Sequence, residues 1–242
     1  MTARASAGRR PHSRVVGVIT SYTDLEFAVR MRQPPDLFEL RLDQLADIID
    51  ELEKKISGLR SPLIITARHP REGGANDLSL RRRRNLLTRF LPHADYLDIE
   101  LRSASALHSL LTLAKQKKVR CVISLHDFKS TPLPRVLTAK ALAAERHGAD
   151  IFKVATRTDT PIQLGCLLNL ITDKDVHVAI SAMGIGKLGA ISRVLLAYRG
   201  SALVYGSVAA ASDIEGQMSL EQLRAFGIGR RMTKREGRRT KE

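Results

Sequence analysis

The sequence predicts a single α/β domain folded as a (β/α)8 TIM barrel. Eight short apolar or β-branched runs recur at intervals of roughly twenty to thirty residues, and most of the intervals carry a helical pattern. No GxGxxG motif follows the first predicted strand, and the chain contains no GxxxxGK[ST] motif, which argues against a nucleotide-binding fold. Strand and helix alternate eight times within about 210 residues, which favours a barrel over an open doubly wound sheet.

The predicted strands share β-branched and apolar side chains, which favour a pleated, buried conformation. In chain order they are residues 15–20 (VVGVIT), 37–42 (LFELRL), 62–68 (PLIITAR), 96–101 (YLDIEL), 120–125 (RCVISL), 151–155 (IFKVA), 177–182 (HVAISA) and 202–206 (ALVYG). The clearest helical patterns lie at residues 79–91, 103–116, 137–148 and 191–200. The last two of these helices end on a glycine, which is typical of a helix C-terminus.

The barrel is predicted to occupy residues 14–227, between two basic tails, residues 1–13 and 228–242, that we expect to be disordered. Residues 1–14 hold four arginines and no acidic residue, and residues 228–242 hold seven Lys or Arg against two Glu. Most of the net charge of +15 therefore lies at the ends. We interpret a further run, Arg81–Arg84, as a solvated basic surface. Because aromatic residues make up only 4% of the chain, the composition argues against nucleic-acid binding other than through the tails.

The sequence contains no apolar run long enough to span a membrane, and its Arg-rich N-terminus lacks the apolar stretch of a secretory signal. We therefore expect a cytoplasmic protein. Cys121 and Cys166 lie in apolar segments, with neither CxxC spacing nor a nearby His cluster. We expect two buried thiols and no metal site.

Charged side chains gather near the predicted carboxyl ends of the strands, which is where the active site of such a barrel lies. Ionised groups are seldom buried unless they are paired. So many of them on one rim indicate a charged pocket rather than one structural ion pair. They are Glu39, Arg41, Asp43, Arg68, Asp98, Glu100, His126, Lys153 and Arg193.

Lys153 lies in the middle of the strand IFKVA. The two-residue period of a strand places it on the face opposite Phe152 and Val154. Because these apolar neighbours suit the helical layer, we expect Lys153 to point into the barrel. It would then either form a structural ion pair with Glu39 or Glu100, or serve as a desolvated, neutral amine that attacks a carbonyl carbon.

His126 follows the apolar run RCVISL and is either a core histidine bonded to backbone or a base of tunable charge. Adjacent strand residues point to opposite faces, so Asp127 is not its expected partner. A carboxylate from another loop is expected, and Glu72 in HPREGG is the candidate. Beside a lysine imine, such a histidine could remove a proton α to a carbonyl, because the protonated imine accepts the electrons.

Six segments occur in order at the predicted strands and loops: ELRLD (39–43), TARHPREGG (66–74), SLHDF (124–128), IFKVA (151–155), AMG to GAISR (182–193) and YGSVAAASDIEGQ (205–217). Together they resemble the type I 3-dehydroquinate dehydratases of the shikimate pathway. The resemblance covers most of residues 14–226.

This resemblance implies dehydration of 3-dehydroquinate to 3-dehydroshikimate by syn elimination, with no metal or organic cofactor. It implies that Lys153 forms an imine with the C3 ketone. His126 would act as general base at C2 and general acid at the C1 hydroxyl, oriented by Glu72. Arg193 would bind the substrate carboxylate with its bidentate fork. The other implied substrate-binding residues are Glu39, Arg41 and Arg68 at the ring hydroxyls, and Ser212 and Gln217 in a closing lid.

Two alternatives stay open. A class I aldolase or transaldolase-like barrel also uses a strand lysine, but the Ile-Ser-Arg and Gly-Gln segments favour a ring that bears a carboxylate over a sugar phosphate. A basic RNA-associated protein, acting through the tails, is the alternative from another class.

The loop from Ser212 to Gln217 is one residue longer than the family pattern, so either Ser212 or Asp213 could occupy the lid position. The resemblance also suggests a homodimer.

Overall fold

The computed structural model describes residues 13–209 and 215–229. Within them one sheet forms, in which all neighbouring strands are parallel, in the order β7-β6-β5-β4-β3-β2-β1-β8-β9. The eight predicted strands are all present, followed by a short ninth. They are β1 (Arg14–Ile19), β2 (Leu37–Arg41), β3 (Leu63–Thr66), β4 (Tyr96–Glu100), β5 (Arg120–Asp127), β6 (Ile151–Arg157), β7 (Ala179–Ile185), β8 (Leu203–Ser207) and β9 (Met218–Ser219).

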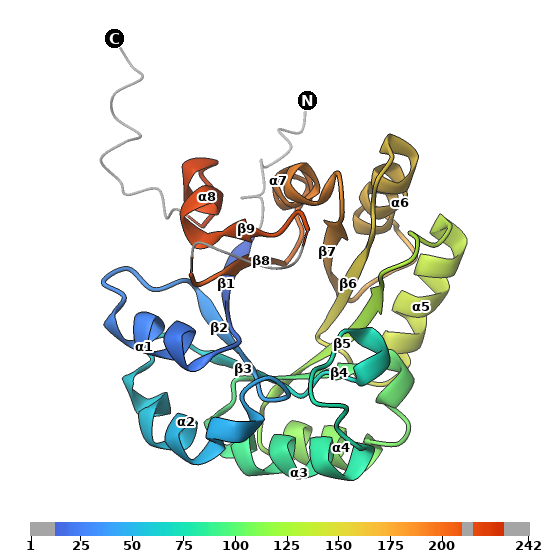
Figure 1. The fold of residues 1–242 in the computed structure, drawn as a ribbon. Coiled ribbons are helices and arrows are strands. Elements are labelled where there is room, and N and C mark those ends of the chain that lie inside the picture. The colour runs from blue at the N-terminus through green and yellow to red at the C-terminus, as the bar shows by residue number, and fades with distance from the viewer. Residues whose placement is uncertain (1–12, 210–214, 230–242) are drawn as a thin grey trace, which may run out of the picture.

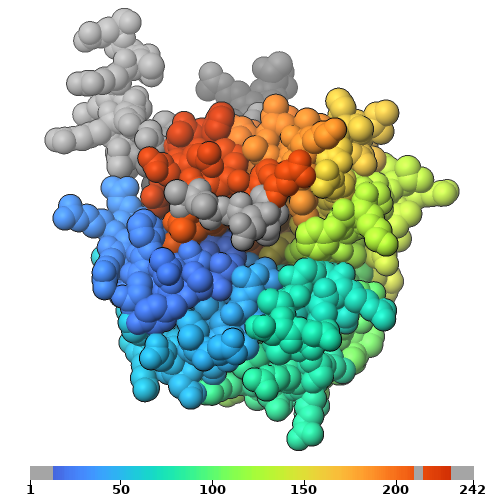
Figure 2. All heavy atoms as spheres, viewed as in Figure 1, coloured from blue at the N-terminus to red at the C-terminus, as the bar shows by residue number. Residues whose placement is uncertain are grey.

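The sheet curls until β7 comes back beside β8. There the backbone N–H of Ala202 donates to the carbonyl oxygen of Ile180 over 2.7 Å, and Ser181 Oγ donates to the Leu203 carbonyl oxygen over 3.0 Å. Figure 1 shows the strands around a central axis with the helices outside them. The space-filling view shows the same segments following one another around the molecule in chain order (Figure 2). The predicted TIM-barrel fold is confirmed.

Helices connect the strands and cover the outer face of the sheet. They are α1 (Tyr22–Arg30), α2 (Ile49–Lys55), α3 (Leu80–Phe90), α4 (His108–Gln116), α5 (Pro134–Arg146), α6 (Pro161–Ile171), α7 (Gly189–Arg199) and α8 (Leu220–Ala225), with 3-10 turns η1 (Ala46–Ile48), η2 (Ile56–Gly58), η3 (Pro70–Glu72), η4 (Leu91–His93) and η5 (Leu101–Ser103). The helix predicted at 103–116 starts later, at His108. Its first residues turn inward instead, where Ser103 Oγ accepts a hydrogen bond from Arg83 over 3.3 Å.

Two apolar clusters hold the barrel together. The larger lies between the sheet and the helices and contains Phe152 and Val154, while the smaller fills the barrel interior and contains Ile151 and Ala155. The predicted alternation along β6 is therefore confirmed, with Lys153 on the inner face. Because the interior cluster fills the barrel from below, the open space is left at the carboxyl ends of the strands.

The first and last described segments are packed against the barrel. Ser13 Oγ donates to the carbonyl oxygen of Ser201 over 2.6 Å, and Ile228 is buried. Residues 1–12 and 230–242, where most of the predicted tails fall, lie outside the described residues. Cys121 and Cys166 are buried free thiols, as predicted.

Candidate active site

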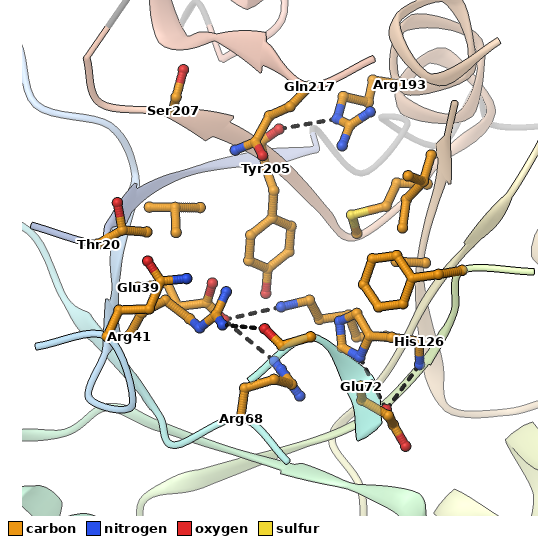
Figure 3. Close-up of a pocket in the computed structure, with 18 of the residues that line it drawn as sticks. Thr20, Glu39, Arg41, Arg68, Glu72, His126, Arg193, Tyr205, Ser207 and Gln217 are labelled. Atoms are coloured by element: carbon orange, nitrogen blue, oxygen red, sulfur yellow. Dashed lines mark hydrogen bonds and ion pairs between the residues drawn. The ribbon is translucent and has the colours of Figure 1, made fainter. Parts of the chain in front are cut away.

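A cavity of about 400 Å³ opens at the carboxyl ends of the strands (Figure 3). Most of the predicted site residues line it: Glu39, Arg41, Arg68, Glu72, His126, Lys153, Arg193 and Gln217. Ser212 and Asp213, the two candidates for the lid position, lie outside the described residues. Eight of the nine predicted residues therefore share one cavity.

Lys153 lies at the centre of a polar layer inside the barrel. Its Nζ donates to Glu39 Oε1 over 3.0 Å and to Asp98 Oδ2 over 3.2 Å. Nζ also lies 3.9 Å from the centroid of the Tyr205 ring. These residues come from β2, β4, β6 and β8, and alternate strands supply each interior layer of such a barrel. Of the two predicted carboxylate partners, Glu39 is confirmed, whereas Glu100 is replaced by Asp98.

Arg68 follows β3 and is held by buried acidic residues. Its Nη1 and Nη2 donate to the two oxygens of Asp98 over 3.0 and 2.9 Å. Nη1 also donates to Glu100 Oε1 over 3.2 Å and to Ser124 Oγ over 2.6 Å. Burial alone would raise the pKa of Asp98, but the charges of Arg68 and Lys153 hold that pKa well below its ordinary value. Arg68 Nη2 also lies 3.8 Å from Glu39 Oε1, so both carboxylates that contact Lys153 belong to one buried charged network.

Arg41, at the end of β2, is paired with Asp43. Its Nε and Nη2 donate to the two carboxylate oxygens over 3.0 and 2.8 Å, and Nη2 also donates to the Gly73 carbonyl oxygen over 2.9 Å. Asp43 accepts further bonds from the backbone N–H groups of Arg68 and Ala75, over 3.1 and 3.0 Å. The pair therefore ties β2 to the loop after β3.

His126 lies near the end of β5 and meets Glu72 of η3. Glu72 Oε2 accepts from the backbone N–H of His126 over 2.9 Å and lies 3.1 Å from its Nδ1 (Figure 3). Asp127 instead accepts from the backbone N–H groups of Lys129 and Ser130. The contact predicted between His126 and Glu72 is confirmed. When Glu72 is ionised, its carboxylate favours the tautomer protonated at Nδ1, which leaves the Nε2 lone pair for a substrate.

The surroundings of Glu72 and His126 shift the pKa of both side chains. Burial raises the pKa of Glu72 to about 7, and the charge of Glu100 adds to the effect. Burial also lowers the pKa of His126 well below its ordinary value, assisted by the positive charges of Arg68 and Lys153. At neutral pH the imidazole is therefore neutral and able to accept a proton.

The raised pKa of Glu72 predicts a pH-dependent cost to stability. A carboxyl whose pKa rises from 4.5 to about 7 on folding binds its proton more tightly in the folded protein, so stability falls as pH increases across that interval. The shift corresponds to about 3 kcal/mol above pH 7. We expect the Glu72→Gln protein to gain roughly this much over the unaltered protein between pH 4.5 and pH 8.

Urea unfolding at both pH values would measure this gain. Glu51→Gln, at an exposed position on α2, is the matched control and should differ equally from the parent at the two pH values. A Glu72→Gln difference that does not change with pH would contradict the prediction.

Arg193, on α7, is buried at the rim of the cavity. Its Nη1 donates to the carbonyl oxygens of Gly184, Gly189 and Gly216 over 2.9, 3.0 and 2.6 Å. Its Nε donates to the carbonyl oxygen of Tyr205 over 3.3 Å (Figure 3). Burial lowers its pKa to about 10, so the guanidinium is charged at neutral pH. No carboxylate in residues 13–209 and 215–229 forms an ion pair with it. This buried cation is therefore suited to an anionic ligand.

Glycine at position 189 makes this arrangement possible. A Cβ added there would lie 2.8 Å from the Cα of Gly216. The two backbones could then not approach closely enough for both carbonyl groups to reach Arg193. Gln217, next in the chain, also lines the cavity.

Two neighbours of Lys153 are not among its partners predicted from the sequence. Asp98 is predicted only as a charged residue near a strand end, and Tyr205 is not among the predicted site residues. Tyr205 shares the inner face of β8 with Leu203 and Ser207, so the two-residue period could have placed it inside. Its hydroxyl is buried with no hydrogen-bond partner among the described residues.

A lysine amine and an imidazole that face one cavity at the carboxyl end of a (β/α)8 barrel define an enzyme built for carbonyl and proton-transfer chemistry. Within that class, the chain belongs to the type I 3-dehydroquinase family, whose model matches residues 15–226. The predicted resemblance and the hydro-lyase class are confirmed, and the aldolase alternative is set aside.

Relatives agree with this assignment. The chain is 32% identical over 205 residues to the catabolic 3-dehydroquinate dehydratase of Acinetobacter baylyi, covering 79% of this chain and 74% of that protein. It is also 32% identical over 206 residues to the 3-dehydroquinate dehydratase of Geobacillus sp. WCH70, with 80% and 79% covered. The crystal structure of 3-dehydroquinate dehydratase from Geobacillus kaustophilus superimposes with a TM-score of 0.79 at 28% identity, covering 89% of this chain and 90% of that one.

Among residues 13–209 and 215–229, no helix combines the length and apolar character needed to cross a bilayer. The same residues contain no group of three or more His, Cys, Asp or Glu side chains placed to hold a metal ion.

Proposed function

We propose that this chain converts 3-dehydroquinate into 3-dehydroshikimate and water by syn elimination through an imine at Lys153, the third step of the shikimate pathway. The observation that carries the proposal is the placement of Lys153 and His126 on neighbouring strands, β6 and β5, facing one cavity. Family membership and the names of the relatives support the same reaction.

Arg193 is the proposed site for the substrate carboxylate. Among the described residues, the hydrogen-bond partners of this buried guanidinium are carbonyl oxygens, so a substrate carboxylate would supply a negative charge to pair with it. Glu39, Arg41 and Arg68 are proposed to bind the ring hydroxyls. Their ion pairs hold them in place before the substrate enters, which lowers the entropy lost on binding.

The lysine reacts first in the proposed mechanism. Nζ loses a proton, for which the two contacting carboxylates offer acceptors, and attacks the C3 carbonyl carbon. Loss of the carbonyl oxygen as water then leaves a protonated imine. This cation is the electron sink for the next step, and the reaction therefore needs no metal or organic cofactor.

His126 then moves the proton. Its Nε2 takes a proton from C2, and the electron pair of the C–H bond flows to the imine nitrogen to form an enamine. The enamine expels the C1 hydroxyl, which receives the proton from the imidazolium and leaves as water. Hydrolysis of the imine releases 3-dehydroshikimate and regenerates Lys153. Glu72 is proposed to hold the imidazole in the required tautomer throughout, with Ser212 and Gln217 closing over the substrate.

Trapping the imine tests this proposal. The protein is incubated with 3-dehydroquinate, reduced with borohydride, digested and mapped by mass spectrometry. We expect one ligand-derived mass on the peptide that contains Lys153, and none on the Lys153→Ala protein. A folded, active protein that yields no adduct would rule out the covalent mechanism, because borohydride reduces any accumulated imine to a stable secondary amine.

The enzyme is proposed to be a cytoplasmic homodimer. Its substrate is a small anionic molecule, and nucleic acid is expected to bind, if at all, through the basic tails alone. Deleting residues 1–12 and 230–242 should then leave dehydration unchanged.

A further inference from the structure

The basic run Arg81–Arg84 is not uniformly solvated. Arg81, Arg82 and Arg84 are exposed on α3, as the sequence suggested. Arg83 is 1% exposed and is one of the largest fully buried side chains in the described part of the chain. A buried arginine is costly unless its donors are satisfied, so its partners are informative.

Arg83 reaches inward from α3 to the carboxyl ends of β3 and β4. Its Nε donates to the carbonyl oxygen of Ala67 over 2.7 Å, its Nη1 donates to Ser103 Oγ over 3.3 Å, and its Nη2 forms an ion pair with Glu100 Oε2. The planar fork thus ties three successive segments together: the end of β3, the end of β4, and η5.

Glu100 connects Arg83 to residues that surround the cavity. Its second oxygen, Oε1, accepts from Arg68 Nη1 over 3.2 Å and from the backbone N–H of His69 over 2.8 Å. Arg68 in turn holds Asp98, which contacts Lys153 Nζ. Glu100 therefore lies between Arg83 and the network around the lysine, without lining the cavity itself.

The Glu100 carboxylate also influences Glu72, the residue that contacts His126. His69 immediately precedes η3, the turn that carries Glu72, and Glu72 contacts His126. The negative charge of Glu100 contributes to the raised pKa of Glu72. The charged or titratable groups that face Glu72 are Glu100 from β4, Arg68 from the loop after β3, Arg102 from η5 and His126 from β5.

We propose that Arg83 is a positioning residue that fixes Glu100 and, through it, both Arg68 and the turn that carries Glu72. This inference rests on the proposed function of the site. Without the guanidinium, Glu100 Oε2 loses its ion pair, and the buried carboxylate either takes up a proton or competes with Asp98 for Arg68. In both cases the charge near Glu72 and the position of its turn change.

The test compares arginines of one helix. We expect Arg83→Met to lower kcat by about 10- to 100-fold, the range found when a residue that supports a reactive group is removed, and to shift the acidic limb of the pH profile. KM should change less than kcat. Arg84→Met, at an exposed position next to it, should leave kcat, KM and the pH profile unchanged. Arg83→Lys, which keeps the charge but not the fork, is the second variant and covers a failure of Arg83→Met to fold.

A double-variant cycle asks whether Arg83 acts through Glu100. If it does, Arg83→Met combined with Glu100→Gln should lose no more activity than Glu100→Gln alone. Losses that multiply would overturn the inference, as would an unchanged kcat and pH profile in folded Arg83→Met and Arg83→Lys proteins.

A readout independent of turnover separates this inference from the proposed function. The ¹⁵N chemical shifts of the His126 ring nitrogens report its tautomer and titration in the substrate-free protein. We expect them to change in the Arg83 variants and not in Arg84→Met. If the unaltered protein failed to dehydrate 3-dehydroquinate, the proposed function would be wrong. The ¹⁵N shifts would still decide whether Arg83 positions Glu72 and His126.

Discussion

Lys153→Arg is expected to lower kcat for 3-dehydroquinate by at least about 10⁴-fold while the protein stays folded. The guanidinium keeps the positive charge that Glu39 and Asp98 require, but it remains protonated and forms no imine. Steady-state kinetics of the formation of 3-dehydroshikimate would measure the loss, and thermal unfolding would confirm that the fold is retained.

Lys153→Met provides the comparison that separates charge from chemistry. It removes the amine and also takes one of the two cations away from the buried carboxylates Glu39 and Asp98, which still face Arg68. Deleting one partner of a buried ion pair costs about 3–5 kcal/mol. We therefore expect both variants to be inactive but only the methionine variant to be strongly destabilised. Appreciable turnover by Lys153→Arg would remove the imine from the mechanism, since the described residues that line the cavity include no second lysine to replace it.

His126→Gln should lower kcat by about 10²- to 10⁴-fold, the usual contribution of a positioned acid–base group. Because the imine forms before the proton is moved, borohydride should still trap the substrate on Lys153 in this variant. Retained trapping together with lost turnover would place His126 after the formation of the imine.

Asp127→Asn is the matched control for this substitution. Asp127 is the next residue of β5, but its carboxylate bonds to the backbone of the following loop and does not line the cavity. We expect near-normal kcat. If His126→Gln retained normal turnover, or if Asp127→Asn were equally inactive, the assignment of the base to His126 would be wrong.

The inner face of β6 shows how far local periodicity extends. Phe152 and Val154 point to the same face of β6, and their apolar character identified this face as the one that packs against the helices. The inward direction of Lys153 therefore followed from the pattern of residues 151–155 alone. Likewise, the opposite directions of His126 and Asp127 excluded the nearest carboxylate and favoured one from another loop. Glu72, the candidate that the family resemblance supports, is the partner found.

The partner of Lys153 shows where this reasoning stops. Glu39 and Glu100 were the candidates, yet Asp98 contacts the lysine and Glu100 bonds to Arg68 and Arg83. Asp98 and Glu100 point to the same face of β4, so their alternation cannot rank them. The stagger between tilted strands decides which one lies level with Lys153.

By itself, then, the sequence determined the order of strands and helices and the inward face of β6, because both depend on local periodicity. It also predicted the family and the pairing of His126 with Glu72, through six short motifs that occur in order between residues 39 and 217. Only the tertiary structure decided that Asp98 lies beside Lys153, that Tyr205 covers it, and that Arg83 is buried among exposed neighbours. These depend on strand stagger and on how closely α3 packs on the sheet. Such distances between segments leave no periodic signal in the chain.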